Sequence, residues 1–289
     1  MNRNDLFTRD KYVLLDGGMG TMLQARGLKL GARPELLSIT EPEMLTGIHR
    51  EYVQAGADIV YANTFGASAK KLEGSGYSVA QVISASLACA RRAVQGTGAL
   101  VALDVGPLGE LLEPAGTLKF EDAYRCFQEI VIAGAQADVI VMETMTDLYE
   151  VKAAILAAKE NSTLPVMVSM SFEQNGRSFT GCTVESFAAT AVGLGADAVG
   201  INCSLGPVEI LPLAQRLCQS VPKNFPVFVK PNAGLPRADG SGYDITPEMF
   251  RDAMAQYLPL GICMLGGCCG TTPQYIGYLA QITKGKAPQ

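Results

Sequence analysis

The sequence predicts a single (β/α)8 barrel, an α/β fold of the TIM-barrel type, on the strength of three observations. Short β-rich segments alternate with helical segments along the chain, eight such units can be counted, and a length of 289 residues suits one barrel domain. Apolar residues make up 48% and charged residues 18% of the chain, a balance that supplies a large core. A doubly wound open sheet is the alternative, but eight such regular units favour closure into a barrel.

Each strand is predicted from a run of apolar and β-branched residues. In chain order these runs are residues 13–16, 58–65, 100–106, 138–144, 165–172, 197–203, 226–232 and 261–268. Helical stretches lie between them, including residues 79–95, 120–135, 147–160 and 247–258. We expect the barrel to span residues 11–283, with an N-terminal extension at 1–10 and a C-terminal tail at 284–289.

Three strands are introduced by a recurring phrase, AGADIV, AGAQADVIV and GLGADAVG. In each, a helix ends in small residues and glycine before an aspartate leads into the strand. This is typical of a helix stop followed by a tight loop. Its recurrence indicates one repeated strand–helix unit.

Charge and composition exclude several classes of partner. The formal net charge is −5 and no run of Lys and Arg could follow a phosphate backbone, so nucleic acid is not expected. No apolar run reaches the roughly 18 residues of a membrane span, and the first residues lack the apolar core of a secretory signal. We therefore expect a cytoplasmic protein with no membrane partner, whose eight cysteines serve metal binding or reactivity rather than disulfides.

Chemistry in this fold sits at the C-terminal ends of the strands. The polar and glycine residues that gather there are Asp16, Gly17, Gly18, Asn63, Thr64, Asp104, Gly106, Glu143, Thr144, Asn202, Cys203, Asn232, Cys268 and Cys269. The single histidine, His49, lies instead in a helical stretch and is interpreted as structural. Any metal site must therefore be rich in sulfur.

Three cysteines from distant parts of the sequence should meet at this rim. Cys203 closes the sixth strand, and Cys268 and Cys269 close the eighth. Because adjacent residues of a strand face opposite sides, the backbone must turn at the pair, and the flanking Gly266, Gly267 and Gly270 permit such a turn. Three thiolates favour zinc in a reducing compartment, while burial as small apolar side chains is the alternative.

Three protein ligands leave a tetrahedral zinc with one open position, which is typical of a catalytic site. A water there would suggest a hydrolase, but the chain has no histidine base to support one. A thiol substrate fits better, because a metal-bound thiol is deprotonated whereas a free thiol is mostly protonated at pH 7. The remaining cysteines are expected in the core, except Cys182, whose role is left open.

Six phrases together resemble the homocysteine S-methyltransferase family, most closely the homocysteine-binding module of cobalamin-dependent methionine synthase. They are LDGGMGTML (15–23), AGADIVYANTF (55–65), ETMTDLYEVKAA (143–154), GINCSLGP (200–207), KPNAGLP (230–236) and GGCCGTTPQYI (266–276). The resemblance runs from about residue 11 to 283. It implies a (β/α)8 barrel whose zinc, held by Cys203, Cys268 and Cys269, binds homocysteine as a thiolate that accepts a methyl group to give methionine.

The remaining site residues follow from the substrate's charges. Glu143 is expected to bind the ammonium of homocysteine and Asp16 to share that role or cap a helix, since an unpartnered buried charge is costly. The turn from Gly17 to Thr21 offers backbone N–H groups to the carboxylate. Asn232 is expected beside the metal and substrate, as an occupant of the fourth zinc position before homocysteine arrives.

The methyl donor is the most open part of this interpretation. We expect methylcobalamin on a separate corrinoid protein, because the phrases DGGMGT and NAGLP favour it, although another part of a longer chain could supply the donor. A small donor such as S-methylmethionine or betaine is the alternative within the class. A zinc hydrolase and a non-catalytic thiol- or corrinoid-binding module are the alternatives outside it.

Overall fold

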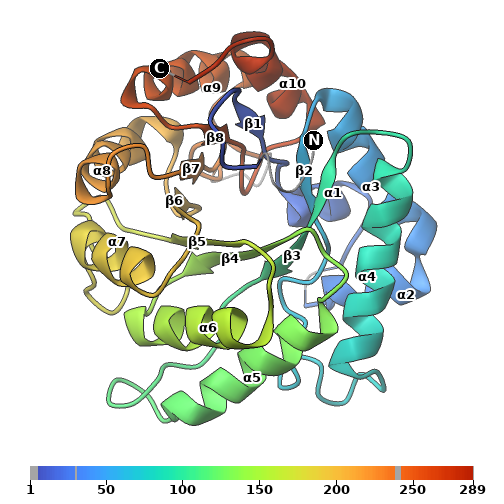
Figure 1. Ribbon diagram of the computed structural model, residues 1–289. Coiled ribbons are helices and arrows are strands. Elements are labelled where there is room, and N and C mark those ends of the chain that lie inside the picture. The colour runs from blue at the N-terminus through green and yellow to red at the C-terminus, as the bar shows by residue number, and fades with distance from the viewer. Residues whose placement is uncertain (1–5, 30, 238–241, 289) are drawn as a thin grey trace.

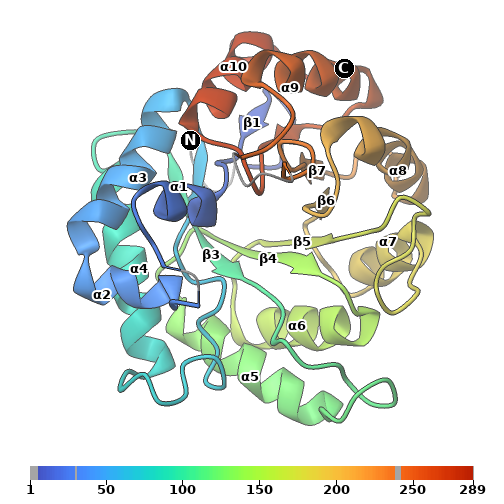
Figure 2. The same cartoon turned by 180° about the vertical axis from the view of Figure 1, so that it is seen from behind.

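Eight parallel strands form a ring at the centre of the molecule, and the helices form a second ring outside it (Figures 1 and 2). This arrangement is that of a computed structural model, which describes residues 6–29, 31–237 and 242–288. Neighbouring strands in the sheet follow the order β1-β8-β7-β6-β5-β4-β3-β2. A bridge between Leu15 and Ile59 joins the two ends, so the sheet closes into a (β/α)8 barrel and the open-sheet alternative is wrong.

All eight predicted strands are present, each within one residue of its predicted segment or shorter. Their bounds are β1 Val13–Leu14, β2 Ile59–Tyr61, β3 Leu100–Val105, β4 Val139–Met145, β5 Val166–Met170, β6 Ala198–Asn202, β7 Val227–Lys230 and β8 Met264–Leu265. The helices that follow or precede them are α1 Met19–Ala25, α2 Leu37–Thr40, α3 Pro42–Ala55, α4 Val79–Val94, α5 Phe120–Ala133, α6 Leu148–Asn161, α7 Val184–Gly193, α8 Pro207–Ser220, α9 Pro247–Met254 and α10 Pro273–Thr283. Two short 3-10 helices, η2 Pro34–Leu36 and η3 Ala255–Leu260, complete the described elements.

The apolar residues divide between two cores because successive strand residues face opposite sides of the sheet. One core fills the barrel interior and contains Leu15, Ala102, Val141, Met167 and Phe228. The other lies between the strands and the outer helices. Leu6, in the predicted N-terminal extension, is 2% exposed and belongs to the interior core. Residues 1–5 of that extension lie outside the described residues.

The recurring aspartate has the same contacts at three places. The backbone N–H of the aspartate donates to a residue of the preceding strand, and the N–H of that residue donates back to the aspartate Oδ2. The pairs are Asp58 with Leu14, Asp138 with Val101 and Asp197 with Val166, with all six N–O distances between 2.7 and 2.8 Å. A cation of an outer helix or its flank pairs with each carboxylate, namely Lys284, Arg91 and Lys159. The aspartates therefore fix strand register at the N-terminal end of the barrel, away from the site.

No helix among the described residues is long and apolar enough to cross a membrane.

His49 gives the fold a pH dependence that can be measured. Its side chain is fully buried in α3 and neither ring nitrogen has a partner in the described structure. Burial lowers the pKa of His49 from 6.5 to about 4. The unfolded chain thus binds more protons than the folded one between these values, so folding stability falls as the pH falls through this window.

We expect the free energy of unfolding to decrease by about 3 kcal/mol between pH 6.5 and pH 4 because of this histidine. A His49→Leu variant should lose that part of the pH dependence in urea unfolding. In the native protein, the single histidine Cε1 proton should show no NMR titration above about pH 5. A resonance that titrates near pH 6.5 would contradict burial of a neutral ring.

Candidate active site

A cavity of about 300 Å³ opens at the C-terminal ends of the strands. Residues from seven of the strand ends or the loops that follow them line it. They include Asp16, Gly17, Gly18, Thr21, Gln24, Glu35, Tyr61, Asn63, Phe65, Asp104, Glu143, Thr144, Cys203, Lys230, Tyr243, Cys268 and Cys269. Most of the rim residues predicted from the sequence line this one cavity, and α1 and η2 contribute to it from the loop after β1. Thr64, Gly106, Asn202 and Asn232 are not among its lining residues.

The three predicted cysteines converge on one side of this cavity. The Sγ atoms of Cys203, Cys268 and Cys269 all lie within 4.8 Å of one another, and those of Cys203 and Cys269 are 3.9 Å apart. Among the described residues, this is the group of cysteine, histidine and acidic side chains whose ligand atoms are close enough to hold a metal ion. The other five cysteines lie outside it.

The backbone turns sharply to present these thiols. Cys203 and Ser204 have φ angles of 61° and 60°, in the left-handed region that non-glycine residues seldom adopt. The strand β8 ends at Leu265, so the adjacent cysteines follow it in a turn, and Gly270 has a φ of +81°. A side chain at Gly267 would come within 2.4 Å of Thr271. The predicted turn is confirmed, and the strained backbone at Cys203 is of the kind concentrated at functional sites.

Asn202 connects the cysteine cluster to the neighbouring strands, a role that the sequence did not reveal. Its side-chain oxygen accepts hydrogen bonds from Thr144 N and Ser169 Oγ, both at 2.8 Å. Its amide nitrogen donates to Thr144 Oγ1 at 2.8 Å and lies 3.8 Å from Cys268 Sγ. Because this buried amide is fully partnered, it fixes the ends of β4, β5 and β6 relative to Cys268.

The thiols perturb one another strongly. Contacts with Cys268 and Cys269 lower the pKa of the Cys203 thiol to about 3. Contacts with Cys203 raise the pKa of Cys269 to about 11 and that of Cys268 well above its usual value. The cluster therefore accommodates one negative charge shared among three sulfurs, and three thiolates would require a cation between them.

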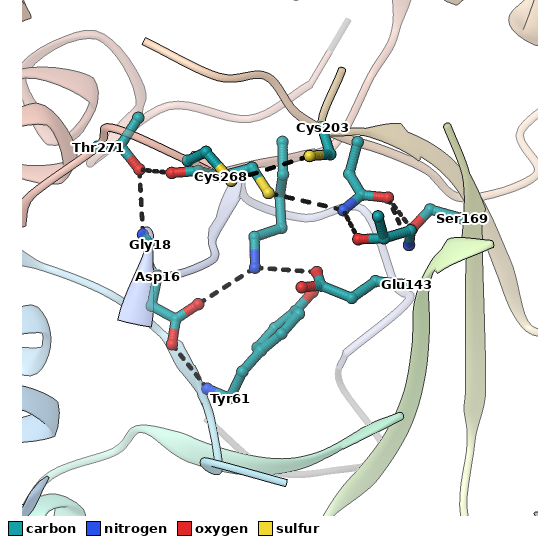
Figure 3. A network of polar contacts seen from close by, with 12 residues as sticks. Asp16, Gly18, Tyr61, Glu143, Ser169, Cys203, Cys268 and Thr271 are labelled. Atoms are coloured by element: carbon teal, nitrogen blue, oxygen red, sulfur yellow. Dashed lines mark hydrogen bonds and ion pairs between the residues drawn. The ribbon is translucent and has the colours of Figure 1, made fainter. Parts of the chain in front are cut away.

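A buried lysine, Lys230, lies among the acidic side chains of the cavity. Lys230 Nζ is 3.3 Å from Asp16 Oδ1 and 3.3 Å from Glu143 Oε2, and it stands 3.4 Å from the centre of the Tyr61 ring. Asp16 Oδ2 also accepts a hydrogen bond from Tyr61 N at 2.7 Å. Figure 3 shows Asp16, Glu143 and Tyr61 close to one another in this part of the cavity. The contacts of Lys230 with these residues link β2, β4 and β7 to the loop after β1.

The charges of this cluster are set by burial and by one another. Burial disfavours the Lys230 ammonium, but Glu143 and Asp16 outweigh that effect and hold the pKa of Lys230 well above its usual value. Burial raises the pKa of Asp16 to about 6 against the opposing influence of Lys230. At neutral pH, Asp16 is thus ionised and paired with a charged Lys230.

The other predicted site residues also lie at this rim. Gly17 and Thr21 line the cavity, and Thr21 Oγ1 accepts a hydrogen bond from Gly270 N at 2.8 Å. The N–H of Gly18 is already bonded to Thr271, at 3.1 Å from its carbonyl and 3.2 Å from Oγ1. Asn232 Oδ1 accepts from Cys269 N at 3.1 Å, so this amide lies beside the cysteine cluster. The first turn of α1 is therefore fastened to the loop that carries Cys268 and Cys269.

Residues 13–283 match the sequence model of the protein family described as homocysteine S-methyltransferase. The methionine synthases of Mycobacterium tuberculosis and Mycobacterium leprae are 34% and 33% identical to the chain over 93% of its length. The chain spans about a quarter of the length of these curated relatives, 24% in both cases.

Among solved structures, the homocysteine methyltransferase MmuM from Escherichia coli in its metallated form has the same fold, with a TM-score of 0.82 and 24% identity. The match covers 96% of this chain and 98% of that one. The apo form of the same protein matches with a TM-score of 0.76. These similarities support the single barrel fold described above.

Replacing Lys230 by Met should be strongly destabilising, because the change leaves Asp16 and Glu143 buried without their cation. We expect a loss of about 3–5 kcal/mol in the free energy of unfolding, measured by urea denaturation at pH 7.5. Lys159→Met is the matched control. Its partner Asp197 is at the surface, and exposed ion pairs contribute about 1 kcal/mol or less. Equal losses for the two variants would contradict the central place given to Lys230.

Proposed function

The chain belongs to the homocysteine S-methyltransferase family, and on this basis we propose that it transfers a methyl group to the thiolate of homocysteine at a zinc site formed by Cys203, Cys268 and Cys269. The observation that carries the proposal is the convergence of three thiols on one wall of a cavity whose facing wall carries buried acidic groups. A thiol amino acid presents complementary groups to both walls. The product of the transfer would be methionine.

The three cysteines fit zinc in both geometry and charge. A tetrahedral zinc with bonds of about 2.3 Å to sulfur has its sulfurs about 3.8 Å apart. The measured separation of Cys203 and Cys269 is 3.9 Å. The mutual pKa shifts of the thiols also indicate a site that needs a cation before all three can ionise. When bound there, zinc would supply an open position at which a thiol is held deprotonated near neutral pH.

The protein's own groups would orient the substrate. Glu143 and Asp16 give the cavity the negative charge that an ammonium requires, and Lys230 keeps both carboxylates in place. Asn202 and Asn232 hold the loops that carry Cys268 and Cys269. Gly17 and Thr21 line the same cavity from the start of α1, where we place the carboxylate end of the substrate. Holding the sulfur and the amino-acid end at two fixed points would present the sulfur to the donor in one orientation.

The transfer forms a bond between the homocysteine sulfur and the methyl carbon and breaks the bond between that carbon and the donor. We propose a methylated corrinoid carrier as the donor, because the phrases around Asp16 and Asn232 resemble those of cobalamin-dependent methionine synthase. Both mycobacterial relatives are also methionine synthases, of which this chain corresponds to one part. The carrier would approach the open end of the cavity.

The donor can be identified with the zinc-loaded protein and homocysteine. Methylcobalamin, S-methylmethionine and betaine are supplied in separate reactions, and methionine is measured by mass spectrometry. We expect methionine from methylcobalamin. Methionine from a small donor alone would show the corrinoid part of the proposal to be wrong, and no methionine from any donor would count against methyl transfer itself.

Replacing Cys269 by Ala should remove zinc binding and lower the rate of methionine formation by at least about 100-fold, because one ligand of three is lost. Metal content is measured by inductively coupled plasma mass spectrometry, and folding by circular dichroism. Cys182→Ala is the control, since Cys182 is half-buried and lies outside the cysteine cluster. Retention of one zinc per chain by the Cys269→Ala variant would refute the ligand assignment.

A further inference from the structure

Strand β4 is irregular near its C-terminal end. Its pairing with β5 shifts register between Met142 and Met145. Within this interval Thr144 has a φ of 62°, in the left-handed region, which is a rare conformation for a β-branched residue. Strained backbone of this kind persists only where the surrounding structure holds it, and it is concentrated at functional sites. The strain at Thr144 therefore calls for an explanation in terms of what this residue contacts.

Thr144 orients the side-chain amide of Asn202. The N–H of Thr144 and the hydroxyl of Ser169 both donate to Asn202 Oδ1, each at 2.8 Å. Because a backbone N–H can only donate, this end of the amide must be the oxygen. The amide nitrogen is thereby left to donate to Thr144 Oγ1 at 2.8 Å and to Cys268 Sγ at 3.8 Å. The strained residue thus directs an N–H donor at one sulfur of the cysteine cluster.

Asn202 reaches Cys268 from outside the cavity. Asn202 is 0% exposed and is not among the residues that line the cavity, whereas Cys268 lines it. A molecule that enters the cavity therefore does not displace this contact. Hydrogen bonds to an ionised acceptor are strong, and contacts made to a metal ligand by its neighbours tune that ligand. A thiolate that shares its charge with an N–H donor is a weaker nucleophile.

The other two sulfurs of the cluster have donors of their own. The N–H of Ser204 donates to Cys203 Sγ, within the left-handed turn formed by these two residues. The hydroxyl of Tyr243 donates to Cys269 Sγ. The Tyr243 ring lies against Gly270, where a Cβ would come within 2.3 Å of it, so the ring is held beside the cysteine pair. Each cysteine sulfur therefore receives a neutral donor from a different residue.

A methyl acceptor bound at this cluster would be one sulfur among four, and the three cysteine thiolates are potential acceptors as well. We propose that Asn202, Ser204 and Tyr243 each donate a hydrogen bond to one cysteine sulfur and so make the cysteines poor methyl acceptors, which directs the methyl group to the sulfur of the substrate. The inference rests on the proposed function and adds to it the selection of one sulfur. The three donors are positioning residues, because they act through the cysteines.

The test treats the zinc-loaded full chain with methyl iodide in the absence of homocysteine. A cysteine sulfur forms a bond to the methyl carbon while the carbon–iodine bond breaks and iodide leaves. The initial rate at each cysteine is measured by mass spectrometry of its peptide. Asn202→Leu should raise the rate at Cys268, and Tyr243→Phe the rate at Cys269, by about 10-fold each, as expected for loss of one hydrogen bond to a charged group. Rates at the other two cysteines of the cluster should change by less than about 3-fold.

Cobalt(II) in place of zinc gives a second readout, which a merely structural role would not move. The sulfur-to-cobalt charge-transfer absorption should shift to longer wavelength in both variants, because a sulfur without its donor gives up an electron more readily.

Asn161→Leu and Tyr278→Phe are the matched controls. Asn161 donates to Ala157 O and Tyr278 donates to Glu248, and neither residue lines the cavity. Both controls should leave the methylation rates and the cobalt spectrum unchanged. Circular dichroism and zinc content show which variants are folded and loaded. Should Asn202→Leu fail either check, Tyr243→Phe tests the same inference at Cys269.

The outcomes separate this inference from the function on which it rests. If a zinc-loaded variant methylates its own sulfur no faster than the wild-type protein does, the role of that donor is refuted and the proposed function stands. The same conclusion follows if all three cysteines react faster to an equal extent. If the wild-type protein binds no zinc, the proposed function fails and this inference fails with it.

Discussion

A single ammonium group, buried where the barrel strands end, fixes the interior of the site. Lys230 reaches from β7 to Asp16 after β1 and to Glu143 in β4, and it stands against the ring of Tyr61 in β2. Removing two carboxylates from water is tolerable only when a cation and hydrogen bonds compensate, so these groups depend on one another. The lysine therefore ties together four parts of the cavity wall that have no sequence proximity, and the positions of the surrounding carboxyl groups follow from it.

The cysteine side of the cavity is built on a different principle. There the constraint is backbone geometry, with left-handed residues at Cys203, Ser204 and Gly270 turning thiols inward where a regular strand would direct adjacent side chains apart. The buried amide of Asn202 and the amide of Asn232 connect these turns to β4 and to one another. Ionic contacts therefore fix the part of the cavity around Lys230, whereas backbone turns and hydrogen bonds between neutral groups fix the part around the cysteines.

Much of this could be predicted from the sequence, and the reasons for the remainder are physical. The eight strands followed from apolar runs, and the rim residues followed from the rule that chemistry sits where parallel strands end. Lys230 was passed over because a lysine after three apolar residues can point into the barrel or outward, and only the register of β7 settles its direction. Asn202 and Asp104 were placed at the rim, but whether each is satisfied or free depends on partners from other strands, such as Ser169 for Asn202. Such tertiary contacts produce no local pattern in the amino-acid sequence.

The three aspartates at the opposite end of the barrel show how the chain is modular. Each aspartate is hydrogen-bonded to the strand that precedes it, which joins β1 to β2, β3 to β4 and β5 to β6. The start of β8 is instead joined to β7 by backbone contacts such as the hydrogen bond from Cys263 N to Val227 O. The repeating element is therefore a pair of strand–helix units, a quarter of the barrel, rather than a single unit. A chain divided between such pairs keeps each aspartate and its partner strand on one contiguous segment, while a chain divided within a pair places them on different segments. Circular permutation or fragment complementation of this barrel should accordingly respect the boundaries after α4, α6 and α8.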